Sequence, residues 1–191
     1  MARILAFSGS TRRASLNRKL IRIAAEGARL AGGEVMLVDL DDYPMPIYNG
    51  DLEAAEGLPE PSRDFKQLLR AHDGILISSP EYNGSISPLL KNTLDWASRA
   101  EDADGGPLAA YRGKVAAIMS ASPGAFGGAR GLIHLRQLLT NLGVMVLPDQ
   151  QAVRQAGTAF DEDGALVDEQ RQKKVEQCGA ELVRVVDRLL G

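Results

Sequence analysis

Short apolar runs alternate along this chain with segments whose apolar residues recur at helical spacing. Five runs are suited to buried strands: Arg3–Phe7, Glu34–Val38, Gly74–Ser78, Val115–Ser120 and Val144–Leu147. Strict strand–helix alternation predicts a parallel sheet with helices covering both of its faces. Because crossovers in such sheets are right-handed and the chain has only 191 residues, few topologies remain.

The short chain favours the flavodoxin-like topology, a three-layer α/β/α sandwich with a five-stranded parallel sheet in the order 2-1-3-4-5. The intervening helices are predicted from apolar positions such as Leu16 and Leu20, Phe65 and Leu69, Leu132 and Leu139, and Val175 and Leu182. Another helix is expected from about Pro88 to Trp96, because proline is accepted in a first turn. With 45% hydrophobic and 25% charged residues, residues 1–191 are expected to form a single domain.

Two stretches interrupt the alternation. Residues 40–61 contain four of the nine prolines, and residues 148–167 precede the last helix. Irregular connections of this length are usually functional or mobile. The first is consistent with a lid, a partner-contact loop or a tolerated insertion.

Charge and composition exclude several classes of protein. A net charge of −3 argues against nucleic-acid binding, which favours a basic face. No apolar run approaches the roughly 18 residues of a membrane span, and the first residues lack a secretory signal, so we expect a cytoplasmic protein. The single cysteine, Cys178, excludes an internal disulfide and a multi-cysteine metal site; no metal site is predicted.

The segment from Ser8 to Asn17 is rich in groups that bind anions. It contains the hydroxyls of Ser8, Ser10, Thr11 and Ser15, the carboxamide of Asn17, and the guanidinium groups of Arg12 and Arg13. It follows the first strand and precedes a helix, whose free N–H groups and partial positive charge favour a phosphate. The segment is therefore predicted to hold a terminal phosphate.

Basic residues continue beyond this segment. Arg12, Arg13, Arg18, Lys19 and Arg22 fall within eleven positions of an otherwise acidic chain. This concentration indicates an anionic ligand, and the alternative is an ordinary solvated helix face.

Two further loops should lie at the same edge of the sheet, because ligands in open parallel sheets bind beyond the carboxyl ends of the strands. Residues 80–85, P-E-Y-N-G-S, offer an aromatic ring, an amide and a tight turn that suit a flat heterocycle. Residues 120–128 precede the leucine-rich helix, whose free amides would stabilise negative charge on such a ring. Small residues there are equally consistent with helix–strand packing.

Three motifs resemble the NADPH-dependent FMN reductase family, which includes bacterial quinone and chromate reductases and azoreductases. They are G-S-T-R-R-A-S-L-N at 9–17, P-E-Y-N-G at 80–84 and L-K-N-T-L-D-W at 90–96. The similarity continues through G-G-A-R at 127–130 and H-L-R-Q at 134–137, and it covers roughly residues 3–147.

The resemblance implies a noncovalent FMN, with NADPH or NADH as co-substrate. It places the FMN phosphate on the first loop and the isoalloxazine edge on the second loop. The loop at 120–122 is implied to close the third side of the FMN site. The implied cofactor-binding residues are Ser10, Arg12, Ser15, Leu16, Asn17, Pro80, Glu81, Tyr82, Asn83, Gly84, Ser120, Ala121 and Ser122. Relatives often carry adjacent hydroxyls in the third loop, so Ala121 should act through its backbone. A homodimer or homotetramer is also implied.

The expected reaction passes hydride from NAD(P)H through the flavin to a small-molecule electron acceptor such as a quinone, free flavin, azo compound or chromate. Such chemistry belongs to the cofactor, so no catalytic residue is nominated; His72 and His134 are interpreted as structural. A Rossmann dehydrogenase with Asp39 on a ribose is excluded, because G-x-G-x-x-G is absent. A flavodoxin-like electron carrier and a non-catalytic flavin-binding module remain as alternatives.

Overall fold

The main sheet is parallel, and its strand order is β2-β1-β3-β6-β7, with β8 pairing to the far half of β6. A computed structural model describes residues 1–101, 106 and 108–191. The strands are β1 (Arg3–Ser8), β2 (Glu34–Val38), β3 (Gly74–Ser78), β6 (Val115–Ala121), β7 (Met145–Val146) and β8 (Gln151–Val153). The predicted order 2-1-3-4-5 is confirmed, because β6 and β7 are the fourth and fifth strands of the main path.

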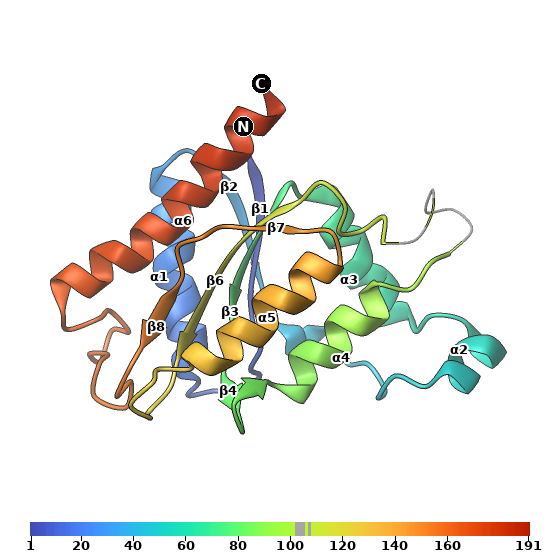
Figure 1. Ribbon diagram of the computed structural model, residues 1–191, viewed down its shortest axis with the longest axis horizontal. Helices are drawn as coiled ribbons and strands as arrows, with labels where there is room; N and C mark the ends of the chain where they lie inside the picture. The colour runs from blue at the N-terminus through green and yellow to red at the C-terminus, as the bar shows by residue number, and fades with distance from the viewer. Residues whose placement is uncertain (102–105, 107) are drawn as a thin grey trace.

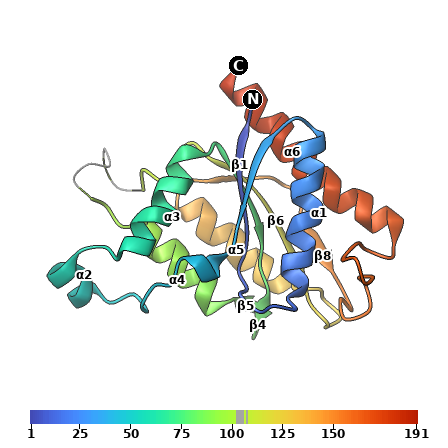
Figure 2. The same cartoon turned by 180° about the vertical axis from the view of Figure 1, so that it is seen from behind.

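Helices cover both faces of the sheet (Figures 1 and 2). On one face lie α1 (Leu16–Leu30) and α6 (Glu169–Leu190); on the other lie α3 (Glu60–Ala71), α4 (Pro88–Ala97) and α5 (Ala129–Asn141). Alternate residues of each strand point to opposite faces, so Ile4 packs beneath α1 and α6 while Phe7 packs beneath the other three. The predicted three layers are confirmed. Within the described residues, no helix combines the length and the apolar character needed to cross a bilayer.

Helices α1 and α6 touch through their backbones. A Cβ atom on Gly179 would lie 1.9 Å from the carbonyl oxygen of Ala24, and one on Gly27 would lie 2.1 Å from that of Glu176. Only glycine permits this approach at either position. The last helix of the chain is therefore fixed directly against the first.

The two edges of the sheet differ from expectation. Strand β2 was predicted to be buried on both faces, but Met36 and Leu37 are 43% and 37% exposed. The prediction is wrong because β2 pairs only with β1 and forms an edge. At the other edge, the predicted strand 144–147 reduces to β7. Pro148 follows it, and β8 forms within the stretch that was expected to be irregular.

Residues 40–61 are partly ordered into short helices, η1 (Leu40–Asp42) and α2 (Gly50–Glu56). The segment between them is bonded to α4. The carbonyl oxygen of Pro46 accepts hydrogen bonds from Trp96 Nε1 at 2.7 Å and from Asn92 Nδ2 at 2.9 Å. The backbone N–H of Tyr48 in turn donates to Asn92 Oδ1 at 2.8 Å. This part of the stretch is therefore anchored to the helical layer.

Candidate functional site

Three loops meet around one cavity of about 110 Å³ at the carboxyl ends of the strands, the lower edge in Figure 1. Each predicted loop contributes to its lining. The lining residues are Ser10, Arg12, Ser15, Leu16, Asn17, Pro80, Glu81, Tyr82, Ala121, Ser122 and Pro123. Of the predicted residues, Asn83, Gly84 and Ser120 are not among them.

The first loop offers a set of free donors. Ser15 caps α1, since its hydroxyl accepts from the backbone N–H of Arg18 at 3.3 Å. Within the described residues, the amides of Leu16 and Asn17 donate to no protein acceptor, and the Ser10 hydroxyl and the exposed Arg12 have no protein partner. Unpaired amides at a helix start, a hydroxyl and a guanidinium are the groups that bind a phosphate.

The carboxamide of Asn17 joins the first loop to the third loop and to the end of β3. Its Nδ2 donates to the carbonyl oxygen of Ala121 at 2.9 Å, and its Oδ1 accepts from the Ala121 N–H at 2.9 Å. The Ser78 hydroxyl donates to the same Oδ1 at 2.8 Å. These contacts occupy most of the Asn17 side chain and both backbone groups of Ala121. Groups that were expected to face a ligand are thus used within the protein, and one N–H of Asn17 is left for a ligand.

The second loop is a hairpin of β4 (Glu81–Tyr82) and β5 (Ser85–Ile86). Its two turn residues, Asn83 and Gly84, have φ angles of 52° and 80°. Positive φ at both central residues defines the type I′ turn that an Asn-Gly pair favours. Asn83 and Gly84 therefore form the tip of the hairpin, whereas Tyr82 lines the cavity and is 48% exposed.

Glu81 fastens this hairpin to α5. Its side chain is only 8% exposed, and it accepts from the Gly131 N–H at 2.9 Å and from Arg130 Nη2 at 2.8 Å. Burial raises the pKa of this carboxyl, but the hydrogen bonds from Gly131 and Arg130 and the charge of Arg130 outweigh burial, so the pKa is lowered. The start of α5, predicted to offer free amides to a ring, is instead occupied by the Glu81 carboxylate.

The third loop needs a glycine directly behind the cavity. Gly128 has a φ of 88°, and a Cβ atom there would lie 1.9 Å from the buried Ser120 Oγ. Ser120 therefore lies beneath the loop, and Ser122 and Pro123 line the cavity instead. Pro123 and Arg130 were not predicted as site residues. Pro123 belongs to the loop at 120–128 and Arg130 to the G-G-A-R motif at 127–130, both of which were noted in the sequence. The sequence does not indicate that Arg130 pairs with Glu81.

The histidines and the cysteine lie elsewhere. His72 Nδ1 lies 2.7 Å from the Leu68 carbonyl oxygen, and His134 Nδ1 lies 3.0 Å from the Ser85 hydroxyl. Cys178 lies on the buried face of α6 and is 5% exposed, and burial raises its pKa to about 11. None of the three lines the cavity.

The donor set fits the phosphate of a phosphorylated cofactor. The amides, Ser10, Ser15 and Arg12 together present several N–H and O–H groups and one uncompensated positive charge. A cavity of about 110 Å³ is smaller than the roughly 300 Å³ at the lower end of small-molecule sites. It has room for a phosphate-sized group, and a larger ligand would have to extend over the open surface beside the hairpin.

Comparison with known proteins gives a consistent result. Residues 2–158 match the family model of NADPH-dependent FMN reductase. An NAD(P)H-dependent FMN reductase of Pseudomonas aeruginosa is 37% identical over 99% of this chain and 97% of its own. The NADPH:quinone oxidoreductase of Arabidopsis thaliana is 35% identical over 100% of this chain and 95% of its own.

Solved structures agree. FerB, a flavoenzyme NAD(P)H:(acceptor) oxidoreductase from Paracoccus denitrificans, superimposes with a TM-score of 0.81 at 27% identity and covers 98% of both chains. A flavodoxin from the domain Archaea superimposes with a TM-score of 0.62 at 10% identity, over 97% of this chain and 99% of its own. The second likeness shows the fold alone.

Proposed function

The chain belongs to the NADPH-dependent FMN reductase family, and from this premise we propose that it transfers hydride from NAD(P)H through bound FMN to a small-molecule acceptor. The observation that carries the proposal is the convergence of three strand-end loops on one cavity with uncompensated phosphate-binding groups. Full-length similarity to NAD(P)H-dependent FMN and quinone reductases supports the same activity.

FMN is the cofactor of this family, and when bound it supplies the two-electron chemistry. The protein binds and orients it. We assign the phosphate to Arg12, Ser10 and the first amides of α1, where charge-assisted hydrogen bonds are strongest. We assign the ring edge to the backbone of the hairpin from Pro80 and to Tyr82, both of which line the cavity.

Asn17 and Glu81 have positioning roles in this proposal. Asn17 holds the first loop against Ala121, and Glu81 holds the hairpin against α5. Glu81 is the only carboxylate that lines the cavity among the described residues. Because it is already bonded to Arg130 and Gly131, we propose no protein acid or base.

We propose a quinone as the acceptor, because several relatives are named as quinone reductases. Tyr82 lines the cavity and is 48% exposed, so a flat oxidant would have access from solvent beside its ring. Free flavin, an azo compound and chromate should be tested side by side with the quinone.

We also propose a homodimer or homotetramer. Three large apolar side chains are exposed on the hairpin, on the third loop and on α5: Tyr82 at 48%, Phe126 at 62% and Ile133 at 62%. Large exposed apolar groups on neighbouring elements are typical of interaction surfaces. Light scattering should give at least twice the chain mass at micromolar concentration, and a monomer would contradict the proposal.

The activity is tested with FMN-loaded protein under anaerobic conditions. NADPH should bleach the flavin absorbance, and a quinone should restore it and support many turnovers. A protein that binds FMN but is not reduced by NADPH would indicate the electron-carrier or binding-module alternative. A protein that takes up no FMN would overturn the reductase proposal and both alternatives.

A further inference from the structure

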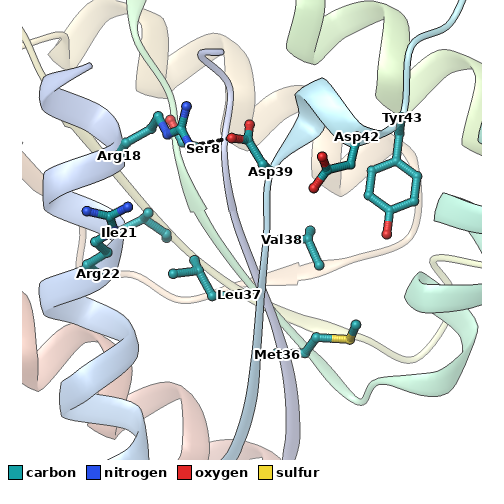
Figure 3. Close-up of a pocket in the computed structure, with 10 residues that line it drawn as sticks. All are labelled: Ser8, Arg18, Ile21, Arg22, Met36, Leu37, Val38, Asp39, Asp42 and Tyr43. Carbon is teal, nitrogen blue, oxygen red and sulfur yellow. Dashed lines mark ion pairs between the residues drawn. The ribbon is translucent and has the colours of Figure 1, made fainter. Parts of the chain in front are cut away.

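A second cavity, of about 410 Å³, opens beside strand β2. Figure 3 shows Arg18 and Arg22 projecting from α1 on one side, Asp42 and Tyr43 on the other, and the side chain of Leu37 between them. The cavity is separate from the site described above, and of its lining residues only Ser8 belongs to the segment that was predicted to hold the phosphate. Its volume lies within the usual range of small-molecule sites, roughly 300–1,000 Å³.

The cavity contains a buried hydroxyl without a partner. Ser8 lines it at the carboxyl end of β1 and is 5% exposed, and its Oγ makes no hydrogen bond to any residue that the structure describes. Buried hydroxyls are nearly always paired, and leaving one unpaired is destabilising. An unsatisfied group at this position indicates a polar ligand.

The charges in the cavity are separated along it. Arg18 forms an ion pair with Asp39, whose Oδ1 also accepts from the Asp41 N–H at 3.2 Å. The Asp39 carboxylate is therefore already bonded within the protein, and it holds Arg18 in place. Within the part of the chain that the structure describes, Arg22 and Asp42 have no ion-pair partner. An anionic group suits the Arg22 side, and hydrogen-bond donors such as hydroxyls suit the Asp42 side.

The edge strand β2 separates these charges, with Leu37 on the Arg22 side and Met36 on the Asp42 side (Figure 3). Leu37 and Met36 line the cavity and are 37% and 43% exposed. Because β2 pairs only with β1, alternate backbone N–H and C=O groups face outward. On the Arg22 side, the Leu37 side chain offers an apolar surface and the strand edge offers free backbone groups, which suit the face and the edge of a nucleobase.

We propose that this cavity binds the adenosine half of NADPH, with the 2′-phosphate on Arg22 and the base against Leu37. This inference rests on the proposed function, because it presumes NADPH as hydride donor. In Rossmann sheets, a side chain near the end of the second strand recognises the ribose or its 2′-phosphate; this chain lacks the Rossmann glycine motif, and only the position beside the second strand is comparable.

The location is compatible with hydride transfer at the first site. Strands β2 and β3 are separated by β1 alone, so their ends lie about 10 Å apart at roughly 4.8 Å per strand. The ring-facing hairpin follows β3 directly. One extended dinucleotide can therefore reach from the hairpin to the cavity beside β2.

The test is calorimetric titration of the FMN-loaded protein with adenosine 2′,5′-bisphosphate, which lacks the nicotinamide. We expect saturable binding that weakens at least tenfold in Arg22→Gln. Arg188→Gln removes the same charge from an exposed position on α6 and should bind as the wild type does. Adenosine 5′-monophosphate should bind at least tenfold more weakly than the bisphosphate.

Kinetics provide a second measurement. In Arg22→Gln, KM for NADPH should rise at least tenfold with kcat unchanged, while KM for reduced nicotinamide mononucleotide, which lacks adenosine, should stay constant. The inference is overturned if the bisphosphate does not bind, if Arg22→Gln binds it equally well, or if the KM values for both donors rise together. Failure of the wild type to oxidise NADPH would instead overturn the proposed function.

Discussion

The side chain of Asn17 makes both backbone hydrogen bonds of Ala121, donating to its carbonyl and accepting from its N–H, each at 2.9 Å. One carboxamide thus takes the place of a neighbouring strand at the end of β6. Because Asn17 lies in the first turn of α1, this contact also sets the distance between the phosphate loop and the third loop.

Replacing Asn17 with Ala should lower the free energy of unfolding by about 2–4 kcal/mol. The change removes three buried hydrogen bonds and leaves Ala121 and Ser78 with unpaired groups, each costing about 1–3 kcal/mol unless water enters. Urea denaturation measures the loss. Asn141→Ala, at an exposed position at the end of α5, is the matched control and should change stability little. Equal stability of the two variants would show that the contact contributes nothing.

Replacing Arg12 with Ala should weaken FMN binding about tenfold to hundredfold, because a hydrogen bond to a charged group contributes about 1.5–3 kcal/mol. Arg13→Ala is the control, since Arg13 is also exposed but does not line the cavity. Quenching of flavin fluorescence gives both affinities. If Arg13→Ala has the larger effect, the phosphate assignment is wrong.

The bond between Glu81 and α5 should make stability depend on pH. Since the pKa of Glu81 is lowered in the folded protein, its contribution is complete above the unfolded pKa of about 4.3 and is lost as pH falls through the lower folded value. Glu81→Gln should therefore be less stable than wild type by about 1.5–3 kcal/mol at pH 7. The difference in the free energy of unfolding between wild type and Glu81→Gln should decrease below about pH 4, as measured by thermal unfolding. A gap that is constant with pH would contradict this account.

Cys178 should resist thiol reagents in the native protein. Burial and the nearby charge of Asp149 raise its pKa to about 11, so little thiolate exists at pH 8, and the side chain is 5% exposed. We expect modification by a disulfide reagent to be at least about a hundredfold slower than in urea. Equal rates in both conditions would show that α6 opens readily.

The sequence predicted the order of the sheet because the apolar runs that became β1, β3 and β6 are buried on both faces and carry an unambiguous pattern. The prediction from sequence was wrong at the two edges of the sheet. The run at Glu34–Val38 has the same apolar pattern, but its exposure depends on its having no neighbour beyond it. Residues Gln151–Val153 pair with β6 through backbone groups, which side-chain patterns do not reveal.

The same distinction applies to the site. The loops were predictable because their positions follow from the topology, and most of the predicted residues line the cavity. The direction of each side chain was not predictable. Asn17 and Glu81 are polar residues in the right loops, yet both bond mainly to other parts of the protein. Only tertiary contacts decide whether a polar group faces a ligand or the protein.

The glycine contact between α1 and α6 has a consequence for biosynthesis. The loop that begins α1 leaves the ribosome before α6, but the helix behind it is packed by residues 169–190, which are translated well after it. Until then, one flank of α1 is uncovered and the loop lacks firm support. A nascent chain should therefore acquire flavin only after α6 has emerged and packed against α1.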